Sequence, residues 1–279
     1  MNAKDMLDLT RDFVGEGTAS HWSDLNLMRR INLSQRLVAK IVSMSPGDWL
    51  IKKSSSLTPS SSVITLPSDC SKPVYLEEVT SGRALPWLDG GVKARRVSRM
   101  AGTSLDVGYR EAYPIRNTIE VNEDSYGEAC YLWYEQRVPD LQAGTAAAGA
   151  ALSLTFPDDR NSVRIADYYN SVTLEATSGT GVGTIDTISD YTAARVATVT
   201  GTYSTDTVFG TISLLPEETH MLIILEAALL SLIKPSSTMD EKLMTYLRDE
   251  RNNERKRVEE WLETRVHGSG GVVMGDLAL

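Results

Sequence analysis

The residues of this sequence that could carry out chemistry are few, and they are far apart. The three histidines, His21, His220 and His267, have no carboxylate or cysteine at the spacing of metal ligands. The two cysteines, Cys70 and Cys130, are too distant from each other in the chain to predict a disulfide framework or a zinc site. We therefore expect free thiols in a reducing compartment and no metal or other cofactor.

Four short segments match parts of catalytic motifs. Ser231–Lys234 fits the pattern S-x-x-K, but it lies in an apolar segment and the accompanying motifs are missing from the sequence. Gly179–Gly183 alternates glycines like a phosphate-binding loop but lacks the P-loop Lys-Ser/Thr and the GxGxxG spacing, so we expect a hairpin tip. Two pairs of adjacent carboxylates occur, at 77–78 and 158–159. In an extended segment the side chains of such neighbours point in different directions, so neither pair suits the two-carboxylate site of a glycosidase. The sequence predicts that the protein is not an enzyme.

The composition favours a folded chain of about two domains. Of the 279 residues, 42% are hydrophobic and 23% are charged, which is enough apolar material for a core without disulfides. The most apolar run, Met221–Ile233, contains Glu226 and is shorter than the roughly 20 residues of a membrane span. The first residues do not resemble a secretory signal, so we expect a soluble protein that is not exported. The formal net charge of -9 argues against tight binding of nucleic acid through its phosphates.

The N-terminal part of the sequence carries two helical patterns. Residues 2–13 predict a short helix, which the glycines that follow it end. Ser23 is a good N-cap for a second helix, with Asp24 favourable in its first turn. The apolar residues after Leu27 fall on one stripe of this helix, which we expect to end before Ser45.

The C-terminal part predicts two further helices. Pro216, followed by two glutamates, indicates the start of a helix that is buried nearly all round. Thr238–Glu241 has capping-box spacing for a longer helix, which is apolar at both ends and polar from Arg248 to Arg257. Such a helix either lies against a neighbour or an aqueous channel, or is a solvated surface helix with i,i+4 ion pairs. The candidate residues for a ring interface or channel lining are Arg248, Glu250, Arg251, Glu254 and Arg255.

The middle of the chain is typical of β-structure. Between residues 49 and 140, short β-type runs alternate with turn residues. Residues 140–151 are rich in glycine and alanine, and we expect a hinge there. Residues 151–215 hold short runs rich in Thr, Ser, Gly and Val, which predict a small antiparallel barrel or sandwich. A basic cluster, either a solvated loop face or a contact for DNA or an acidic neighbour, comprises Lys93, Arg95, Arg96 and Arg99.

Together these patterns predict an α+β fold. We expect residues 1–48 and 216–266 to form one discontinuous helical bundle, with a β-rich middle region at 49–140 and an inserted small β-barrel or sandwich at 151–215. The glycines after His267 then lead into an apolar C-terminal tail within residues 267–279. A tail of this kind is either disordered or docked on a partner.

Several segments, in their order along the chain, carry a family resemblance. Trp22–Asp24 with Arg30–Arg36 gives the opening helix, and Ile64–Asp69 reads as an extended x-LP-x-D step. Glu217–Arg265 supplies an acidic helix start, an Ala/Leu-rich helix and a long charged helix. In this order the segments resemble the head-to-tail adaptor (connector or neck) proteins of tailed bacteriophages. Tyr168–Val199 is similar to a small β-insertion of phage structural proteins, and the β-rich middle is larger than in a minimal helical adaptor.

The resemblance implies a structural virion protein of the phage neck. About twelve copies would form a ring under the portal, extend the DNA channel and connect head to tail. The implied partners are the portal protein, further copies of the chain and a downstream neck or tail protein, while genomic DNA passes without specific binding and no membrane is involved. The implied location is the head-tail interface of the virion, and the host cytoplasm during assembly. Because the family's C-terminal tail commonly contacts the portal, the implied contact residues are Val272, Val273, Met274, Leu277 and Leu279.

A second interpretation is a tail or baseplate protein whose β-insertion binds a host surface glycan. The region rich in Thr, Ser and Gly permits it, with Tyr168, Tyr169 and Tyr203 expected to be exposed. A third interpretation, a cell-wall hydrolase, has no supporting constellation of residues.

Overall fold

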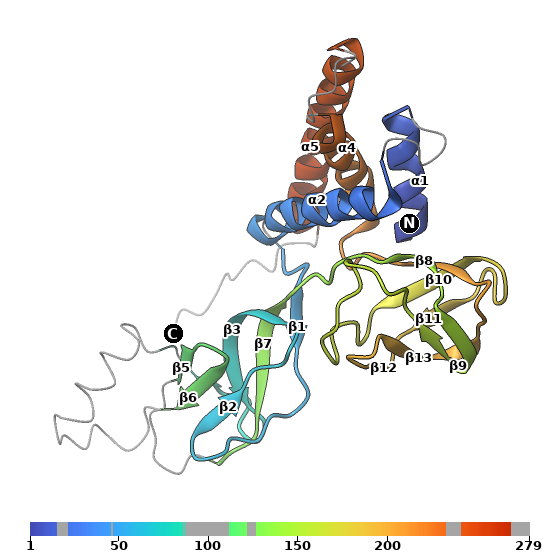
Figure 1. Cartoon of the computed structure of the whole chain (residues 1–279). Helices are drawn as coiled ribbons and strands as arrows, with labels where there is room; N and C mark the ends of the chain where they lie inside the picture. Colours follow the sequence, from blue (N-terminus) through green and yellow to red (C-terminus); the bar gives the residue numbers. More distant parts are fainter. Residues whose placement is uncertain are drawn as a thin grey trace. The chain divides into compact units, whose positions relative to one another are not determined.

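The structure is a computed structural model that describes residues 1–15, 22–45, 47–85, 87, 112–121, 127–232 and 241–268. The chain divides into two compact units, one made of Met1–Trp49 with Val138–Leu279 and the other of Leu50–Arg137. The described helices belong to the first unit, and both units contain antiparallel sheets (Figure 1). The predicted α+β class is confirmed, with N- and C-terminal helices packed together and β-structure between them.

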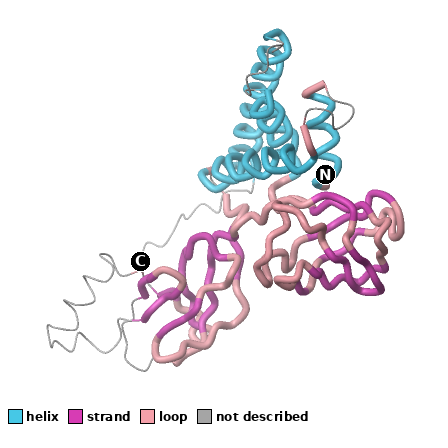
Figure 2. The backbone as a smooth tube through the Cα atoms, in the orientation of Figure 1, coloured by secondary structure: helices cyan, strands magenta, loops and turns pink. Residues whose placement is uncertain are grey.

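The helical part of the first unit, here called the helical body, consists of α1 (Ala3–Phe13), α2 (Asp24–Met44), α4 (His220–Leu232) and α5 (Glu241–Gly268). Side chains cap the first two helices. Ser23 accepts a hydrogen bond from the Asn26 amide, as expected from the sequence, and Asn2 accepts one from the Asp5 amide. A short 3-10 turn, η1 (Glu217–Thr219), follows Pro216 and leads into α4. Figure 2 shows the helices grouped on one side of this unit and its strands on the other.

The helix α4 is the centre of the helical body. It contacts α1, α2 and α5, and its aliphatic side chains from Leu222 to Leu225 are buried. Leu225 and Leu229 pack with Leu247 of α5. The ring of Trp49 lies 4.8 Å from that of Trp261 on α5. Burial of apolar surface around α4 is therefore what holds the two ends of the chain together.

The strands of the first unit form a β-module of two antiparallel sheets. One has the order β11-β10-β14-β8 and the other β12-β13-β9. Both cover an aromatic core in which the ring of Phe156 lies 4.8–5.4 Å from those of Tyr169, Tyr191 and Phe209. The predicted small barrel or sandwich is thus present. The strand bounds are β8 (Ala143–Thr145), β9 (Ala148–Thr155), β10 (Thr173–Ser178), β11 (Ile185–Thr187), β12 (Asp190–Tyr191), β13 (Val196–Thr202) and β14 (Val208–Thr211).

The expected hinge at residues 140–151 is wrong, because β8 and the first part of β9 occupy it. Here the small residues permit close packing of backbone. A Cβ added at Gly149 would lie 2.6 Å from the backbone of Ser204, which no side chain tolerates without a shift. The expected hairpin tip at 179–183 is confirmed, since its three glycines have positive φ angles of 78°, 84° and 78°.

The second unit holds two antiparallel sheets with the orders β1-β7-β3-β4 and β2-β6-β5. Its long central pair joins β3 and β7, with Leu76 opposite Leu132 and both side chains buried. These two leucines pack with Ile64, Ile119 and Tyr134 in one core. The bounds are β1 (Ile51–Lys53), β2 (Val63–Thr65), β3 (Cys70–Glu78), β4 (Ala84–Leu85), β5 (Ala112–Ile115), β6 (Thr118–Val121) and β7 (Cys130–Gln136).

Candidate functional site

Polar side chains of α2 hold the two segments that flank the β-module, one before β8 and one after β14. The side chain of Asn32 pairs with the backbone of Leu141, donating to its carbonyl at 2.9 Å and accepting from its amide at 2.6 Å. Gln35 donates to the carbonyl of Pro139 at 2.8 Å and accepts from the hydroxyl of Ser213 at 2.8 Å. One helix therefore fixes both the segment that enters the β-module and the segment that leaves it.

Arg36 adds an ion pair to this junction. Its guanidinium donates three hydrogen bonds to the carboxylate of Asp140, from Nε at 3.1 Å and from Nη2 at 2.8 and 2.6 Å. Hydrogen bonding to Asp140 raises the pKa of Arg36, while partial burial opposes that rise. The backbone amide of Asp140 in turn donates to the hydroxyl of Tyr168 at 3.1 Å. The bidentate geometry orients Arg36 along the outer edge of α2.

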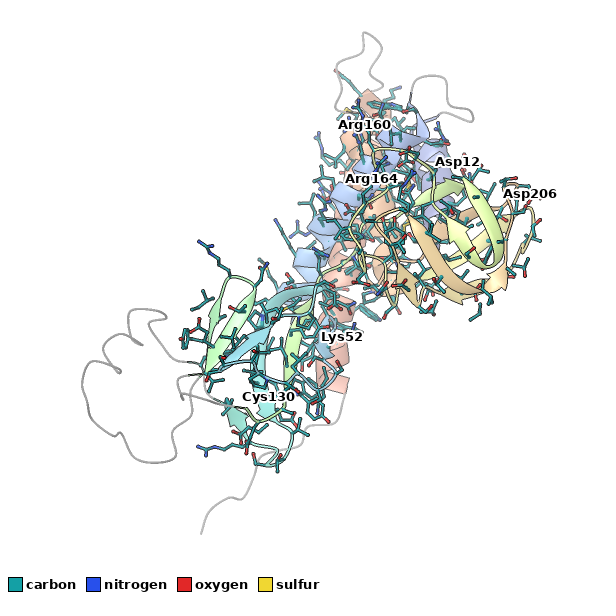
Figure 3. The ribbon with its side chains drawn as sticks, turned by 60° about the horizontal axis from the view of Figure 1, so that its bottom comes forward. Asp12, Lys52, Cys130, Arg160, Arg164 and Asp206 are labelled. Carbon is teal, nitrogen blue, oxygen red and sulfur yellow. The ribbon has the colours of Figure 1, made fainter. Side chains whose placement is uncertain are left out.

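A half-open depression lies beside this ion pair. Its lining combines α2 with the loop that follows β9 and contains three arginines, Arg29, Arg36 and Arg160. Figure 3 labels Arg160 and Arg164 on that loop. Arg164 is bound to Asp158 at 2.6 Å, whereas Arg29 and Arg160 make no ion pair with any described residue. The edge of α2 thus carries a positive surface in a chain whose net charge is negative.

The five α5 residues expected at a ring interface or channel lining have different environments. Arg251 is mostly buried and pairs with Glu226 of α4 at 2.6 Å, so it joins two helices of the same chain. Arg255 pairs with Glu259 one turn further on, and Glu254 pairs with Arg257. The polar middle of α5 is therefore in part an internal contact and in part a surface with i,i+3 and i,i+4 pairs. A role of Arg248, Glu250 and Glu254 toward a neighbour or a channel stays a prediction.

Two other groups of candidate residues lie outside the described residues. The basic cluster of Lys93, Arg95, Arg96 and Arg99 falls between residues 87 and 112. The expected portal contacts, Val272, Val273, Met274, Leu277 and Leu279, follow residue 268.

The fragments of catalytic motifs have structural roles where they are described. The Ser231 hydroxyl donates to the carbonyl of Ala227 within α4. Asp159 accepts hydrogen bonds from the amides of Asn161 and Ser162, which closes the loop after β9. The ring of His220 is buried, with Nε2 3.1 Å from the carbonyl of Leu215. Burial lowers the pKa of this histidine, and the nearby N-terminal amine lowers it further.

The expectation that Tyr168, Tyr169 and Tyr203 are exposed on the β-module is wrong for two of them. Tyr169 is 0% exposed and belongs to the aromatic core, and Tyr203 is 2% exposed. Tyr203 donates its hydroxyl hydrogen bond to Asp186, a buried carboxylate that also accepts from Thr200 and from the amide of Gly201. The half-buried Tyr168 receives the bond from Asp140 described above. These tyrosines therefore offer no stacked aromatic platform for a glycan.

Sequence reasoning did not single out Asn32, Gln35 or Asp186. For Asn32 and Gln35 a local signal existed, because both amides fall on the apolar stripe of α2, where an unpaired polar group would be costly. No comparable signal marks Asp186, since its partners come from another strand of the β-module.

Neither metal sites nor membrane spans are found in the part of the chain that the structure describes. Among these residues no group of three or more His, Cys, Asp or Glu side chains could hold a metal ion. None of the described helices combines the length and hydropathy that crossing a bilayer requires. No protein-family model matches the sequence, and no curated protein matches it.

Proposed function

We propose that this chain is a structural virion protein of the neck of a tailed bacteriophage. In this proposal its copies form a closed ring, of about twelve subunits, under the portal. The ring extends the DNA channel from the head and offers a platform to a downstream neck or tail protein. The chain works by stacking and docking, and it has no catalytic role.

The observation that carries the proposal is the helical body built from the two distant ends of the chain. Its helices α1, α2 and α5 surround α4, and α2 holds the β-module, which lies between α2 and α4 in the sequence, through Asn32 and Gln35. This is the arrangement expected from the resemblance to adaptor proteins. A rigid body with a long charged helix, α5, supplies lateral surfaces for packing beside further copies.

The charge of the chain is compatible with a DNA channel. The formal net charge of -9 means that a ring of copies repels the phosphates of passing DNA instead of retaining them. Under this proposal the exposed polar residues of α5, among them Arg248 and Asn252, face either a neighbouring copy or the lumen. The location follows as the head-tail interface of the virion, with host cytoplasm during assembly.

The test is negative-stain electron microscopy of the purified chain mixed with the portal of the same virus. We expect a second ring of density stacked on the portal at the end that faces the tail. The matched variant lacks residues 268–279, a deletion that removes the expected portal contacts and leaves the described helices nearly complete. We expect it to bind the portal more weakly, as measured by co-sedimentation.

Two outcomes would count against the proposal. Portal rings that carry no additional density at any ratio of the two proteins would contradict the role as a neck ring. Mature particles that lack the chain, as judged by mass spectrometry of purified virions, would contradict it as well. Unchanged portal binding by the truncated variant would contradict only the part of the proposal that concerns the tail.

A further inference from the structure

The outer faces of α1 and α2 carry opposite charges in matching rows. On α2, Arg29, Arg36 and Lys40 form one row of a helical face, next to a row of apolar side chains. The apolar side chains Leu33, Leu37 and Met44 are 47%, 41% and 85% exposed. This surface, made of the six residues named here, is called the α2 stripe.

The corresponding surface on α1 is acidic. Asp5, Asp8 and Asp12 are exposed and, with the half-buried Leu9, recur at the i, i+3, i+4 and i+7 positions of one face. These four residues are called the α1 stripe, and Figure 3 labels Asp12 on it. The opposite face of α1, with Met6 and Leu7, is buried against the rest of the unit. The α1 stripe therefore faces away from the core of its own chain.

The spacing of the charges in the two stripes agrees. Arg29 and Arg36 are seven residues apart, as are Asp5 and Asp12, and both pairs therefore span about 10 Å along a helix axis. Arg36 and Lys40 repeat the four-residue step of Asp8 and Asp12. Two helices laid side by side can thus bring Arg29 and Arg36 opposite Asp5 and Asp12, while Leu9 meets the exposed leucines of α2.

We propose that the α2 stripe of one copy binds the α1 stripe of the next copy. A pair of copies that makes this contact once is joined heterologously and keeps one free stripe of each kind. Repetition of the contact then yields a ring where the rotation closes. The inference rests on the proposed function, to which it adds the surfaces that join neighbouring subunits.

The chemistry of the α2 stripe also favours the α1 stripe of another copy as its partner. Exposed apolar side chains beside a row of cations favour a partner whose own apolar side chain is flanked by carboxylates, and the α1 stripe has that chemistry. Met44 and the α2 leucines would otherwise remain in water. Arg36 also binds Asp140 and Asp8 also binds Lys4 within the chain, so these two groups would share their charge with the partner. Arg29, Lys40 and the neighbouring Arg160 make no ion pair with any described residue.

The experiment exchanges the charges of the two stripes in the full-length chain. Variant A is Arg29→Glu/Lys40→Glu, and variant B is Asp8→Lys/Asp12→Lys. Sedimentation velocity at low salt and at protein concentrations up to about 0.3 mM measures self-association. We expect the wild-type chain to associate, each variant alone to associate at least tenfold more weakly, and an equimolar mixture of A and B to associate again. Raising the salt from about 0.05 to about 0.5 M weakens the wild-type contact through screening.

The matched control changes charge elsewhere by the same amount. Lys72→Glu/Arg83→Glu alters two exposed cations of the second unit, and it is expected to leave self-association as in the wild type. The recovery of association in the mixture also shows that A and B are folded, because unfolded chains do not restore a specific pair. A Leu33→Ser variant, which keeps every charge, is expected to weaken association several-fold.

Several results would overturn the inference. A wild-type chain that remains monomeric at the highest concentration would do so, as would variants that associate like the wild type or a mixture that fails to recover. Binding of duplex DNA that is lost in variant A, with self-association unchanged, would assign the α2 stripe to nucleic acid instead. Variant A rings that form normally on the portal would refute this contact and leave the proposed function intact. If the mixture of variants A and B recovers association in solution but the wild-type chain forms no ring on the portal, the proposed function would be refuted and the contact between the two stripes would stand.

Discussion

The helical body and the β-module of the first unit are stabilised by different kinds of contact. The module is built around an aromatic core, in which Phe156 touches three other rings, and around the buried carboxylate of Asp186 with its hydrogen-bond donors. The helical body is built around the aliphatic helix α4, and its buried polar atoms bind backbone at the junction with the module. Asp186 finds its donors within the module, whereas Asn32 and Gln35 of the body hold the segments at the ends of the module. Hydrogen bonds from Asn2 to Glu175 and from Asn161 to the carbonyl of Leu25 also join the two regions.

The surfaces of the helical body and of the β-module also differ. The outer faces of α1 and α2 carry rows of charges and exposed leucines, which suit contact with a further copy. The exposed apolar side chains of the module are Leu152 and Ile165, and Val182 and Ile185 near the hairpin tip, and exposed residues of this kind are ordinary on a protein surface. Under the proposed function, this difference assigns assembly to the helices and leaves the module as an insertion.

The largest effect is expected from a cavity in the aromatic core. Phe156→Ala removes a ring that contacts Tyr169, Tyr191 and Phe209, and a change of this kind costs about 3–5 kcal/mol in the free energy of unfolding. If the module is self-contained, hydrogen exchange measured by mass spectrometry will show lost protection in its strands and retained protection in α4. Equal loss in the strands and in α4 would mean that the two regions unfold as one.

A glycine pair at the hairpin tip gives the next largest effect. Gly179 and Gly183 have the same φ of 78°, but a Cβ at Gly179 would collide with the backbone carbonyl of Asp206, whereas nothing lies within 4 Å of one at Gly183. We expect Gly183→Ala to cost about 1 kcal/mol from backbone strain alone and Gly179→Ala about 1–3 kcal/mol more. Denaturant titration of both variants measures the difference. Equal costs would mean that the tip moves away from β14 without penalty.

In the helical body, two arginines of α5 allow an internal ion pair to be compared with a surface ion pair. Arg251 pairs with the mostly buried Glu226 of α4, so Arg251→Ala should cost about 1–3 kcal/mol by leaving that carboxylate without its partner. Arg255 pairs with Glu259 at the surface, and Arg255→Ala should cost less than about 1 kcal/mol. Thermal unfolding of the two variants checks this order. A reversed order would indicate that Arg251 serves a neighbouring copy more than its own chain.

The limits of the helices could be predicted because they depend on neighbours in sequence. Ser23 caps α2 and Pro216 precedes the turn that leads into α4, as expected. The glycine and alanine residues of β8 and β9 were misjudged, because small residues look like a hinge until their pairing partners are known. Those partners, Gly210 for β8 and Thr202 for β9, lie more than fifty residues away, where no local pattern points to them.

The candidate site was predictable only in part, for the same reason. The polar middle of α5 was found, but its mixture of an internal pair and surface pairs depends on Glu226, which belongs to a different helix. Tyr168, Tyr169 and Tyr203 lie outside the strands of the β-module, so no alternating pattern in the sequence indicated that two of them are buried. The proposed pairing of the α1 and α2 stripes could not be inferred from the sequence, because it depends on which face of each helix is buried. A charged residue on a helix is expected at the surface whether or not a partner covers it.

The smallest expected effect compares the response of the two regions to pH. Burial lowers the pKa of His220 in the helical body, with the N-terminal amine adding to this and Glu217 and Glu218 opposing it. The folded state therefore binds fewer protons than the unfolded state below about pH 6.5, the ordinary histidine value, and stability falls as the pH drops through that range. Burial opposes the ionisation of Asp186 in the β-module, but its hydrogen bonds from Thr200, Tyr203 and Gly201 prevail and lower its pKa. The stability that the ionised Asp186 contributes is therefore retained until the pH falls below about 4.

Between about pH 6.5 and pH 4.5, protection from hydrogen exchange should thus decline in α4 before it declines in β13, once the rates are corrected for the intrinsic effect of pH. In the variant His220→Gln, whose amide can still donate to the carbonyl of Leu215, the decline in α4 should become shallower while β13 is unaffected. If both regions lose protection together in the wild type and the variant changes neither, the helical body and the module share one stability. The module could then no longer be regarded as an insertion that keeps its fold independently of the helices.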